Sequence, residues 1–419
     1  ETSDALTRIY KNGSPSFSGV TDITPSLLRL NIGATLGMGE LLSISKLLTV
    51  CAKVKSYGRK ADEDSADSLS PVFDELEPLT NLNTDITRCI ISEEEISDEA
   101  SPNLKNIRRH MKLTSDQVHV QLNNIVNSQT AKTYLQDNVI TMRNGRYCIP
   151  VKQEYKNQVQ GMIHDQSQTG STVFIEPMAI VKLNNELREL ALKEAEEIEV
   201  ILANLSASCA EFVNEIECNY RMLVKLDYIF ARAMFSKSYK GTEPNFNSDR
   251  FINIKQGRHP LIPKDKVVPI NIYLGKDFNL LIVTGPNTGG KTVSLKTVGL
   301  LSLMGQAGLH IPADNGSSLS VFNEIYADIG DEQSIEQSLS TFSSHMLNIV
   351  EIIKQATSNS LILVDELGSG TDPLEGANLA ISILDYFKEV GGLVISTTHY
   401  QELKQYALVT AGFKNASVE

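Results

Sequence analysis

The nonapeptide TGPNTGGKT at residues 284–292 stands between two apolar segments with different patterns. Residues 280–283 before it form an uninterrupted apolar run, which is typical of a buried parallel strand, and residues 293–298 after it are typical of the start of a helix. The glycines, the lysine and the last threonine match G-x-x-x-x-G-K-[ST] in the strand–loop–helix setting that this motif requires. The pattern predicts a phosphate-binding loop, and the alternative is a glycine-rich turn that matches by chance.

The residue types in this loop suit a nucleoside triphosphate with a divalent cation. Glycines let the backbone curl so that successive N–H groups, and the helix N-terminus behind them, point at phosphate oxygens. Lys291 places a positive charge beside the β- and γ-phosphates, and the Thr292 hydroxyl is a ligand for Mg²⁺. We therefore expect ATP and Mg²⁺ as cofactors. The loop residues expected to bind the nucleotide are Gly285, Pro286, Asn287, Thr288, Gly289, Gly290, Lys291, Thr292 and Val293.

A second apolar run, at residues 361–364, ends in two acidic residues and predicts another buried strand. Asp365 is expected to hold Mg²⁺ directly or through water, and Glu366 to act as the general base for the attacking water. The alternative is an edge strand that ends in a solvated acidic turn. The phosphate loop earlier in the chain favours the catalytic interpretation.

Two further segments contribute candidate residues. The predicted strand at residues 392–399 ends in His399, which can reach a γ-phosphate because ligands of open α/β sheets bind at the carboxyl ends of the strands. Ser340 is expected to cap the N-terminus of a helix with apolar residues at helical spacing. A hydroxyl at a helix N-terminus suits an anion, and an ordinary capped helix explains the spacing equally well.

Five short segments together resemble the ABC-type ATPase of the MutS family. They are Gly285-Pro286-Asn287, Ser340-Thr341-Phe342, Asp365-Glu366, Gly368-Ser369-Gly370-Thr371 and Thr397-Thr398-His399. Residues 329–338 and 365–373 are most similar to the type II branch of the family, which lacks the mismatch-reading domain.

This resemblance implies roles that the spacing alone does not. Ser340 would contact the γ-phosphate bound by a partner subunit, so the working unit would be a homodimer. Asn287 would help to place the γ-phosphate, and His399 would sense it. His259, in the segment Gly257-Arg258-His259-Pro260, would lie near the adenine, although the residues themselves indicate only a turn.

Composition limits the class of protein. With 41% hydrophobic and 21% charged residues, the 419-residue sequence is typical of a soluble globular protein of two or three domains. It contains no apolar stretch long enough to span a bilayer and no signal segment. Both ends look truncated, so we expect a piece of a longer cytoplasmic chain.

The cysteines are odd in number and lack C-x-x-C spacing, which argues against a disulfide framework or a zinc site and for a reducing compartment. The net charge of −13 neither supports nor excludes a local groove for nucleic acid, because binding depends on the charge at the contact face. The cysteines are Cys51, Cys89, Cys148, Cys209 and Cys218.

Hydrophobic periodicity divides the chain into four parts. Residues 1–138 are expected to form a helical core and a first lever helix, and residues 139–177 a β insert with a hairpin turn at Asn144-Gly145. Residues 178–247 are expected to form a long lever helix that returns to the core, and residues 248–419 the ATPase domain. The predicted fold is an α/β ABC-type P-loop ATPase domain joined to a mainly α-helical core and lever.

The lever is expected to consist of long antiparallel helices. One unbroken helix over residues 178–238 would extend roughly 90 Å, and the helix predicted at residues 101–136 is its expected coiled-coil partner. Residues 241–247 are expected to be a linker. The family resemblance also implies a clamp at the tip of the lever. Basic residues of the β insert either form a solvated face or touch nucleic-acid phosphates. These residues are Arg143, Arg146, Lys152 and Lys156.

The sequence therefore favours the dimeric core of a type II MutS protein that binds and hydrolyses ATP. By resemblance, ATP-driven closure would be coupled to binding of branched or double-stranded DNA, which restrains recombination, or of stalled or collided ribosomes in ribosome quality control. The family's C-terminal Smr domain is missing from the sequence, so nuclease activity is not expected of it. No membrane partner is expected.

Three alternatives stay open. Another long-armed ABC ATPase of DNA repair or chromosome organisation would carry an L-S-G-G-type signature, from which Ser340-Thr341-Phe342 differs. A dimerisation module with a decayed ATPase would have lost one of the phosphate-loop or acidic residues, which are all present. A mismatch-repair MutS protein would insert a Phe-x-Glu motif into DNA, and that tripeptide recurs along this sequence, at Phe73 for example, so it decides nothing.

Overall fold

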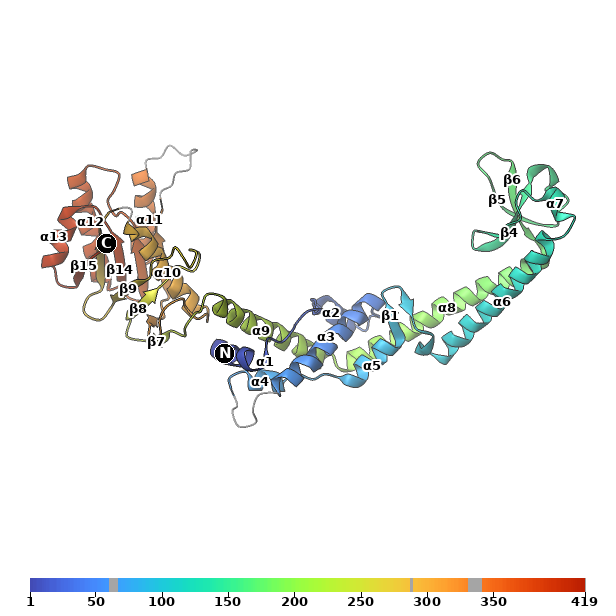
Figure 1. Cartoon of the computed structure of the whole chain (residues 1–419), viewed down its shortest axis with the longest axis horizontal. Helices are drawn as coiled ribbons and strands as arrows, with labels where there is room; N and C mark the ends of the chain where they lie inside the picture. Colours follow the sequence, from blue (N-terminus) through green and yellow to red (C-terminus); the bar gives the residue numbers. More distant parts are fainter. Residues whose placement is uncertain (60–66, 287–288, 331–340, 419) are drawn as a thin grey trace. The chain divides into compact units, whose positions relative to one another are not determined.

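The computed structural model of the chain describes residues 1–59, 67–286, 289–330 and 341–418 (Figure 1). The chain forms two units. The first unit contains Glu1–Ser14, Ala66–Leu69 and Leu226–Glu419, and the second contains Pro15–Ser65 and Ser70–Lys225. The N-terminal helix therefore belongs to the same unit as the phosphate loop, although more than half of the sequence separates them.

The second unit begins with a helical core. Its longest helix, α3 (Met38–Gly58), buries a face that includes Leu41, Leu48 and Cys51, as its helical spacing predicts. The other elements of the core are α2 (Thr24–Asn31), α4 (Ser70–Asp74), α5 (Thr80–Cys89), β1 (Ile90–Ser92), β2 (Glu95–Ile96) and η1 (Asp98–Ala100).

Two long helices, α6 (Pro102–Val126) and α8 (Met178–Glu211), lie side by side and antiparallel (Figure 1). The hydroxyl of Ser101, the N-cap of α6, donates to Glu197 Oε1 at 2.6 Å, just past the middle of α8, and Arg108 Nε donates to Glu194 Oε1 at 2.7 Å. These contacts confirm the predicted antiparallel partnership.

Both predicted lever helices are shorter than expected. Helix α6 ends at Val126, and a turn precedes the short helix α7 (Ala131–Tyr134). The predicted unbroken helix over residues 178–238 is wrong, because Phe212 leaves helical geometry (φ −117°, ψ 24°) and separates α8 from α9 (Val213–Ser238). Apolar residues keep helical spacing on both sides of Phe212, so the interruption leaves no mark in the hydrophobic pattern.

The β insert is an antiparallel sheet with the strand order β3-β4-β6-β5. The hairpin turn at Asn144 and Gly145 is confirmed, because both residues have the positive φ (50° and 72°) that a two-residue turn of this type requires. One face of the sheet, which includes Ile149 and Ile175, packs against Val118 of α6 and its neighbours. The strands are β3 (Thr141–Arg143), β4 (Arg146–Lys152), β5 (Gly161–Gln166) and β6 (Thr172–Pro177).

In the described part of the first unit, a parallel five-stranded sheet has the order β12-β13-β14-β10-β15. The strands that the sequence predicts around residues 280–283, 361–364 and 392–399 are its three central strands, which confirms them, although the third ends at Thr397, two residues before His399. The strands are β12 (Glu324–Asp328), β13 (Ser360–Val364), β14 (Leu393–Thr397), β10 (Leu280–Thr284) and β15 (Phe413–Ser417).

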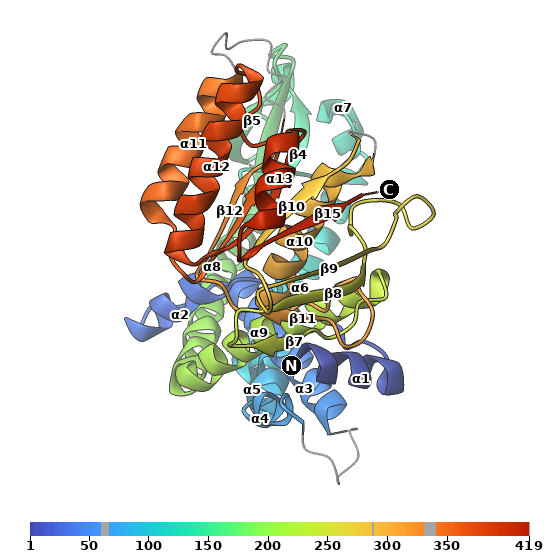
Figure 2. The ribbon, with the colours of Figure 1, turned by 90° about the vertical axis from the view of Figure 1, so that its left-hand side faces the viewer.

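Helices cover both faces of this sheet, which explains why its strands are continuously apolar. Alternate residues such as Leu281 and Leu363 pack with helix α10, and the intervening ones, such as Ile282 and Ile362, pack with helices α11, α12 and α13 (Figure 2). The helices are α10 (Lys291–Gln306), α11 (Thr341–Gln355), α12 (Pro373–Val390) and α13 (Gln401–Val409). Because all five strands run parallel, their carboxyl ends meet at one edge of the sheet.

A smaller sheet with the order β7-β11-β8-β9 accompanies the main one. Its strand β7 (Asn245–Asn247) lies in the segment predicted to be a linker and pairs in parallel with β11 (Ser318–Ser320). The side chain of Asn247 donates to Leu319 O at 2.9 Å, which ties the segment to this sheet. The remaining strands are β8 (Ile252–Gly257) and β9 (Ile270–Leu274).

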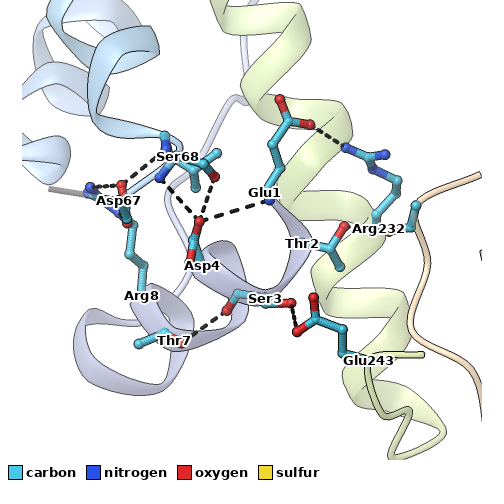
Figure 3. A network of polar contacts seen from close by, with 12 residues as sticks. Glu1, Thr2, Ser3, Asp4, Thr7, Arg8, Asp67, Ser68, Arg232 and Glu243 are labelled. Carbon is cyan, nitrogen blue, oxygen red and sulfur yellow. Dashed lines mark hydrogen bonds and ion pairs between the residues drawn. The ribbon is translucent and has the colours of Figure 1, made fainter. Parts of the chain in front are cut away.

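Polar contacts fix the N-terminal helix α1 (Thr2–Asn12) within the first unit (Figure 3). Arg8 is buried and forms a two-pronged ion pair with Asp67, and Asp4 accepts from the Ser68 hydroxyl at 2.5 Å. On the other side of the helix, Ser3 donates to Glu243 at 2.8 Å. Among the described helices, none is both long and apolar enough to cross a membrane.

Candidate active site

The phosphate loop connects the carboxyl end of β10 to the N-terminus of α10. Gly285 has φ 133°, and a Cβ there would lie 2.8 Å from the carbonyl oxygen of Val418, so the close approach of β15 requires glycine. Gly290 has φ 86° and is the N-cap of α10, and Gly289 N donates to Pro286 O at 3.0 Å. Three predicted site residues, Asn287, Thr288 and Ser340, lie outside the described residues.

Lys291, His399 and Glu366 lie close together. The Lys291 side chain is 2% exposed, and its Nζ donates to Gly285 O at 2.8 Å, beneath the loop. His399 Nε2 lies 3.0 Å from Lys291 Nζ and 3.1 Å from Glu366 Oε1. The structure thus gathers a cation from the first turn of α10 with a carboxylate and an imidazole that follow β13 and β14.

The two residues predicted to hold Mg²⁺ are in contact. The Thr292 hydroxyl donates to Asp365 Oδ2 at 2.6 Å, and Asp365 N donates to Asp328 O at 2.8 Å, which fixes the acid to the neighbouring strand β12. A hydroxyl and a carboxylate are hard oxygen donors of the kind that Mg²⁺ prefers. Within the described ranges, no group of three or more His, Cys, Asp or Glu side chains could hold a metal.

Glu366 has a strained backbone. Its φ of 50° lies in the left-handed region, which costs a non-glycine residue about 1 kcal/mol or more. Its N–H donates to the Thr397 hydroxyl at 2.8 Å, and Thr397 donates in turn to Asp365 Oδ1. The strain therefore lies at the residue predicted to be the general base.

A pocket of about 340 Å³ opens at this edge of the sheet, and a volume of this size is at the lower end of small-ligand sites. Two lysines and two acids contribute to its wall, so it can neutralise phosphate charge and also accept a proton. The lining residues are Lys291, Thr292, Lys296, Gly330, His345, Asp365, Glu366 and Ser369.

The two outlying predicted residues stand apart from this wall. The His259 pKa is lowered, first by burial of the ring and second by the charge of Lys296, so the imidazole is neutral near pH 7. Its Nδ1 accepts from Leu261 N at 3.3 Å. Val293, in the first turn of α10, is 40% exposed. Neither residue lines the pocket, and adenine contact by His259 stays a prediction.

Sequence reasoning missed several residues of the site. Lys296 lies one helical turn after Thr292 and on the same face of α10, a spacing that could have revealed it. His345 Nδ1 lies 2.9 Å from Asp328 Oδ2, and this pair joins α11 to β12 beside the pocket. Tyr400 donates to Gly368 O at 2.8 Å, and burial, then nearby carboxylates, raise the pKa of its hydroxyl.

The arginines of the β insert have acidic partners. Arg146 Nη1 lies 2.9 Å from Glu176 Oε1, and Arg143 Nε lies 3.2 Å from Asp165 Oδ2 while its guanidinium sits 4.1 Å from the centre of the Phe174 ring. Lys152 Nζ donates to a backbone carbonyl at 3.3 Å, and Lys156 is exposed. Both arginines are thus in ion pairs within the β insert, and Arg146 is too buried to belong to the solvated face that was one of the two predicted alternatives.

Known proteins are similar in sequence to this chain. Residues 281–419 match the family MutS domain V. The endonuclease MutS2 of Lachnoclostridium phytofermentans is 60% identical over 425 residues, that of Agathobacter rectalis 58% over 419, and that of Clostridioides difficile 50% over 421. Each comparison covers 100% of this chain and 53% of the relative, so the chain spans about half the length of the curated relatives that it matches.

The comparisons and the fold agree. The matched residues contain the phosphate loop, the acidic pair and the five strands of the main sheet, apart from the first residue of β10. The name endonuclease belongs to relatives about twice as long as this chain. The chain is a homologue of the MutS2 proteins, and its C-terminal part is the MutS domain V ATPase.

Proposed function

We propose that this chain is the dimeric, ATP-hydrolysing core of a type II MutS protein and works with ATP and Mg²⁺ at the pocket described above. The contact between Thr292 and Asp365 carries the proposal, because it joins the end of the phosphate loop to the acid of β13. Lys291 and Glu366 line the same pocket. A cation charge, hard oxygen ligands and a base beside bound phosphates are the parts that phosphoryl transfer to water needs.

The residues have distinct roles in this proposal. Lys291 and the loop N–H groups bind the β- and γ-phosphates, and Thr292 and Asp365 hold Mg²⁺, which when bound neutralises charge on the phosphate oxygens. Glu366 takes a proton from water while the water oxygen bonds to the γ-phosphorus. The bond from that phosphorus to the bridging oxygen breaks, and the electron pair leaves with ADP. His399 contacts both Lys291 and Glu366, and these contacts support its proposed role in sensing the γ-phosphate.

The finer parts of the proposal rest on the family. Ser340 would complete the partner's site in a homodimer, with Asn287 and His259 on the nucleotide. Closure of the dimer would then act on branched DNA or on stalled ribosomes. The relatives' name, endonuclease MutS2, favours nucleic acid as the target. All five cysteines are free, which suits the reducing cytoplasm.

The first test measures the mass of the chain in solution with and without ATP and Mg²⁺, using Glu366→Gln to retain the nucleotide. A dimer that forms or tightens with ATP supports the shared site. The matched control is Lys291→Ala, which should bind ATP poorly and show no nucleotide-dependent change in mass. A monomer under every condition, despite bound ATP, would contradict the dimeric core.

A second test separates shared from independent sites. Ser340→Ala and Lys291→Ala subunits are each expected to be inactive alone. A mixed dimer contains one site with both native residues, so mixing should restore up to about half of the wild-type activity per mixed dimer if each site draws on both chains. Confirmed mixed dimers without any recovery would exclude the role of Ser340 in the partner's site.

The target is tested with ATP-bound Glu366→Gln. Binding to a four-way DNA junction, to a linear duplex of equal length and to purified ribosomes is compared in the same buffer. Preference for the junction over the duplex supports branched DNA, and binding to ribosomes alone supports the ribosomal role. Failure to bind any of the three would remove both targets from the proposal.

A further inference from the structure

Thr397 lies at the carboxyl end of β14, behind both acids of the site rather than in the pocket wall. Its side chain is fully buried, and Val283 of β10 is its partner in the sheet. On the other side, Ser396 pairs with Val364, the residue before Asp365. The sheet register therefore places the Thr397 hydroxyl beside the end of β13, which Asp365 and Glu366 follow.

One hydroxyl holds two different parts of the acidic pair. The Thr397 hydroxyl donates to Asp365 Oδ1, and its oxygen accepts from the backbone N–H of Glu366 at 2.8 Å. A hydroxyl has one donor and two acceptor sites, so both interactions can exist together. Thr292 donates to the other oxygen, Oδ2, of Asp365. The Asp365 carboxylate is thus held from both sides by hydroxyls.

The second interaction coincides with the strain at Glu366. A residue in the left-handed region persists only where its surroundings enforce that conformation. The hydrogen bond from Glu366 N to Thr397 is one such constraint, and Leu367 N adds another by donating to Thr397 O at 3.3 Å. These bonds set the direction in which the Glu366 side chain leaves the backbone.

We infer that Thr397 is a positioning residue for ATP hydrolysis, whose hydroxyl fixes the Asp365 carboxylate and the Glu366 backbone in one geometry. The inference rests on the proposed function, since it assigns Thr397 to the same two acids. Thr397 acts through Asp365 and Glu366, and it needs no contact with the nucleotide. Its hydroxyl should therefore matter for turnover much more than for ATP binding.

The test compares two substitutions at this position. Thr397→Val keeps the shape and removes the hydroxyl, and Thr397→Ser keeps the hydroxyl and removes the methyl group. We expect Thr397→Val to lower kcat about 10- to 100-fold, the range in which small misplacement of catalytic groups falls. The KM for ATP should change less than about threefold, and Thr397→Ser should restore most of the lost kcat.

Thr297→Val is the matched control. Thr297 is also buried, at 2% exposed, but its hydroxyl donates to Val293 O within helix α10. This variant undergoes the same chemical change in the same unit and should keep wild-type kcat. Thermal unfolding of both valine variants measures the structural cost. If Thr397→Val does not fold, Thr397→Ala, which also removes the hydroxyl, is used in place of the valine variant.

A second readout does not need turnover. The affinity for a fluorescent ATP analogue is measured with Mg²⁺ and with EDTA. Loss of the Asp365 constraint should make the increase in affinity caused by Mg²⁺ smaller. If Thr397→Val keeps wild-type kcat and the wild-type increase in affinity with Mg²⁺, the inference is overturned, but the proposed ATPase function is not. Equal loss of kcat in Thr397→Ser and Thr397→Val would also overturn it. A wild-type chain without ATPase activity would defeat the proposed function, and the inference with it.

Discussion

Glu176 in the β insert and Asp365 in the ATPase domain are both carboxylates near the end of a β-strand, but their partners differ. Glu176 is fully buried and accepts from Arg146 at 2.9 and 3.1 Å, from Asn184 at 2.8 Å and from the ring of His164. Asp365 accepts from the hydroxyls of Thr292 and Thr397, which carry no charge.

The difference distinguishes an acid with a structural role from the acid that we propose to hold Mg²⁺. An arginine and further donors satisfy the Glu176 oxygens, so the group fixes the sheet to the start of α8 and has no capacity left for a ligand. The hydroxyl partners of Asp365 hold its direction without neutralising it, which leaves the carboxylate able to attract a cation. The two acids also differ in burial, because Glu176 is fully buried and Asp365 only partly so, but the charge of the partners is what distinguishes their proposed roles.

Glu366→Gln should have the largest effect on function. The amide cannot take a proton from water, so we expect kcat to fall at least about 100-fold, as for loss of a general base. ATP affinity should stay within about threefold of wild type, measured by equilibrium binding in the presence of Mg²⁺. Hydrolysis at the wild-type rate would exclude Glu366 as the base. It would also weaken the contrast between the structural acid Glu176 and the acids of the candidate site.

Glu176→Gln should affect stability instead of catalysis. Loss of the carboxylate leaves Arg146 with a nearly buried, unpaired charge, a change that costs about 3 kcal/mol of folding free energy. Urea denaturation followed by circular dichroism measures this cost. The control is Glu189→Gln on α8, where an exposed pair with Lys193 is lost and no measurable change is expected. A fall in kcat greater than about twofold for Glu176→Gln would break the distinction.

The ATPase-containing unit should also lose stability in acid. Burial lowers the pKa of His310, so the folded protein resists its protonation while the unfolded chain does not. Stability is therefore complete above the usual histidine pKa of about 6.5 and decreases as the pH falls below it. Unfolding temperatures at pH 7.5 and 5.5 measure the effect, and His310→Asn should make the difference between them smaller. An equal difference in that variant would assign the effect to other groups.

The smallest effect concerns the cysteines of the second unit. Burial raises the pKa of Cys51 and of Cys209 to about 12, so both remain unreactive thiols at neutral pH. Cys218 is only partly buried and should react first with a thiol reagent at pH 7.5. Cys218→Ser should remove the fast phase of labelling. A fast phase that persists in this variant would show that buried groups of this unit are accessible.

Local sequence was sufficient to predict which residues meet at the centre of the candidate site. The phosphate loop, Asp365, Glu366 and His399 each follow an apolar strand, and parallel strands bring their carboxyl ends together. The role of Thr397 depends on the register between β13 and β14, which no local pattern encodes. Arg146 pairs with Glu176, which lies 30 residues away in the sequence. The sequence alone therefore left the charge of Arg146 looking available for nucleic-acid phosphates.

Some features of the fold left no readable signal. The interruption at Phe212 lies within a continuous helical pattern, because apolar residues keep their spacing across it. Strand β7 has three residues, and its pairing with β11 links segments more than 70 residues apart, so the segment looked like a linker around Pro244. Short strands that depend on distant partners are the elements that periodicity predicts least well.

The left-handed backbone of Glu366 has a consequence for any attempt to improve this protein by selection. Glycine adopts φ 50° without strain, so Glu366→Gly should raise thermal stability by about 1 kcal/mol. It would also delete the carboxylate that we propose as the general base. A directed-evolution campaign that rewards heat resistance alone would therefore enrich inactive clones at this position, and only a screen that couples survival to turnover would retain the glutamate.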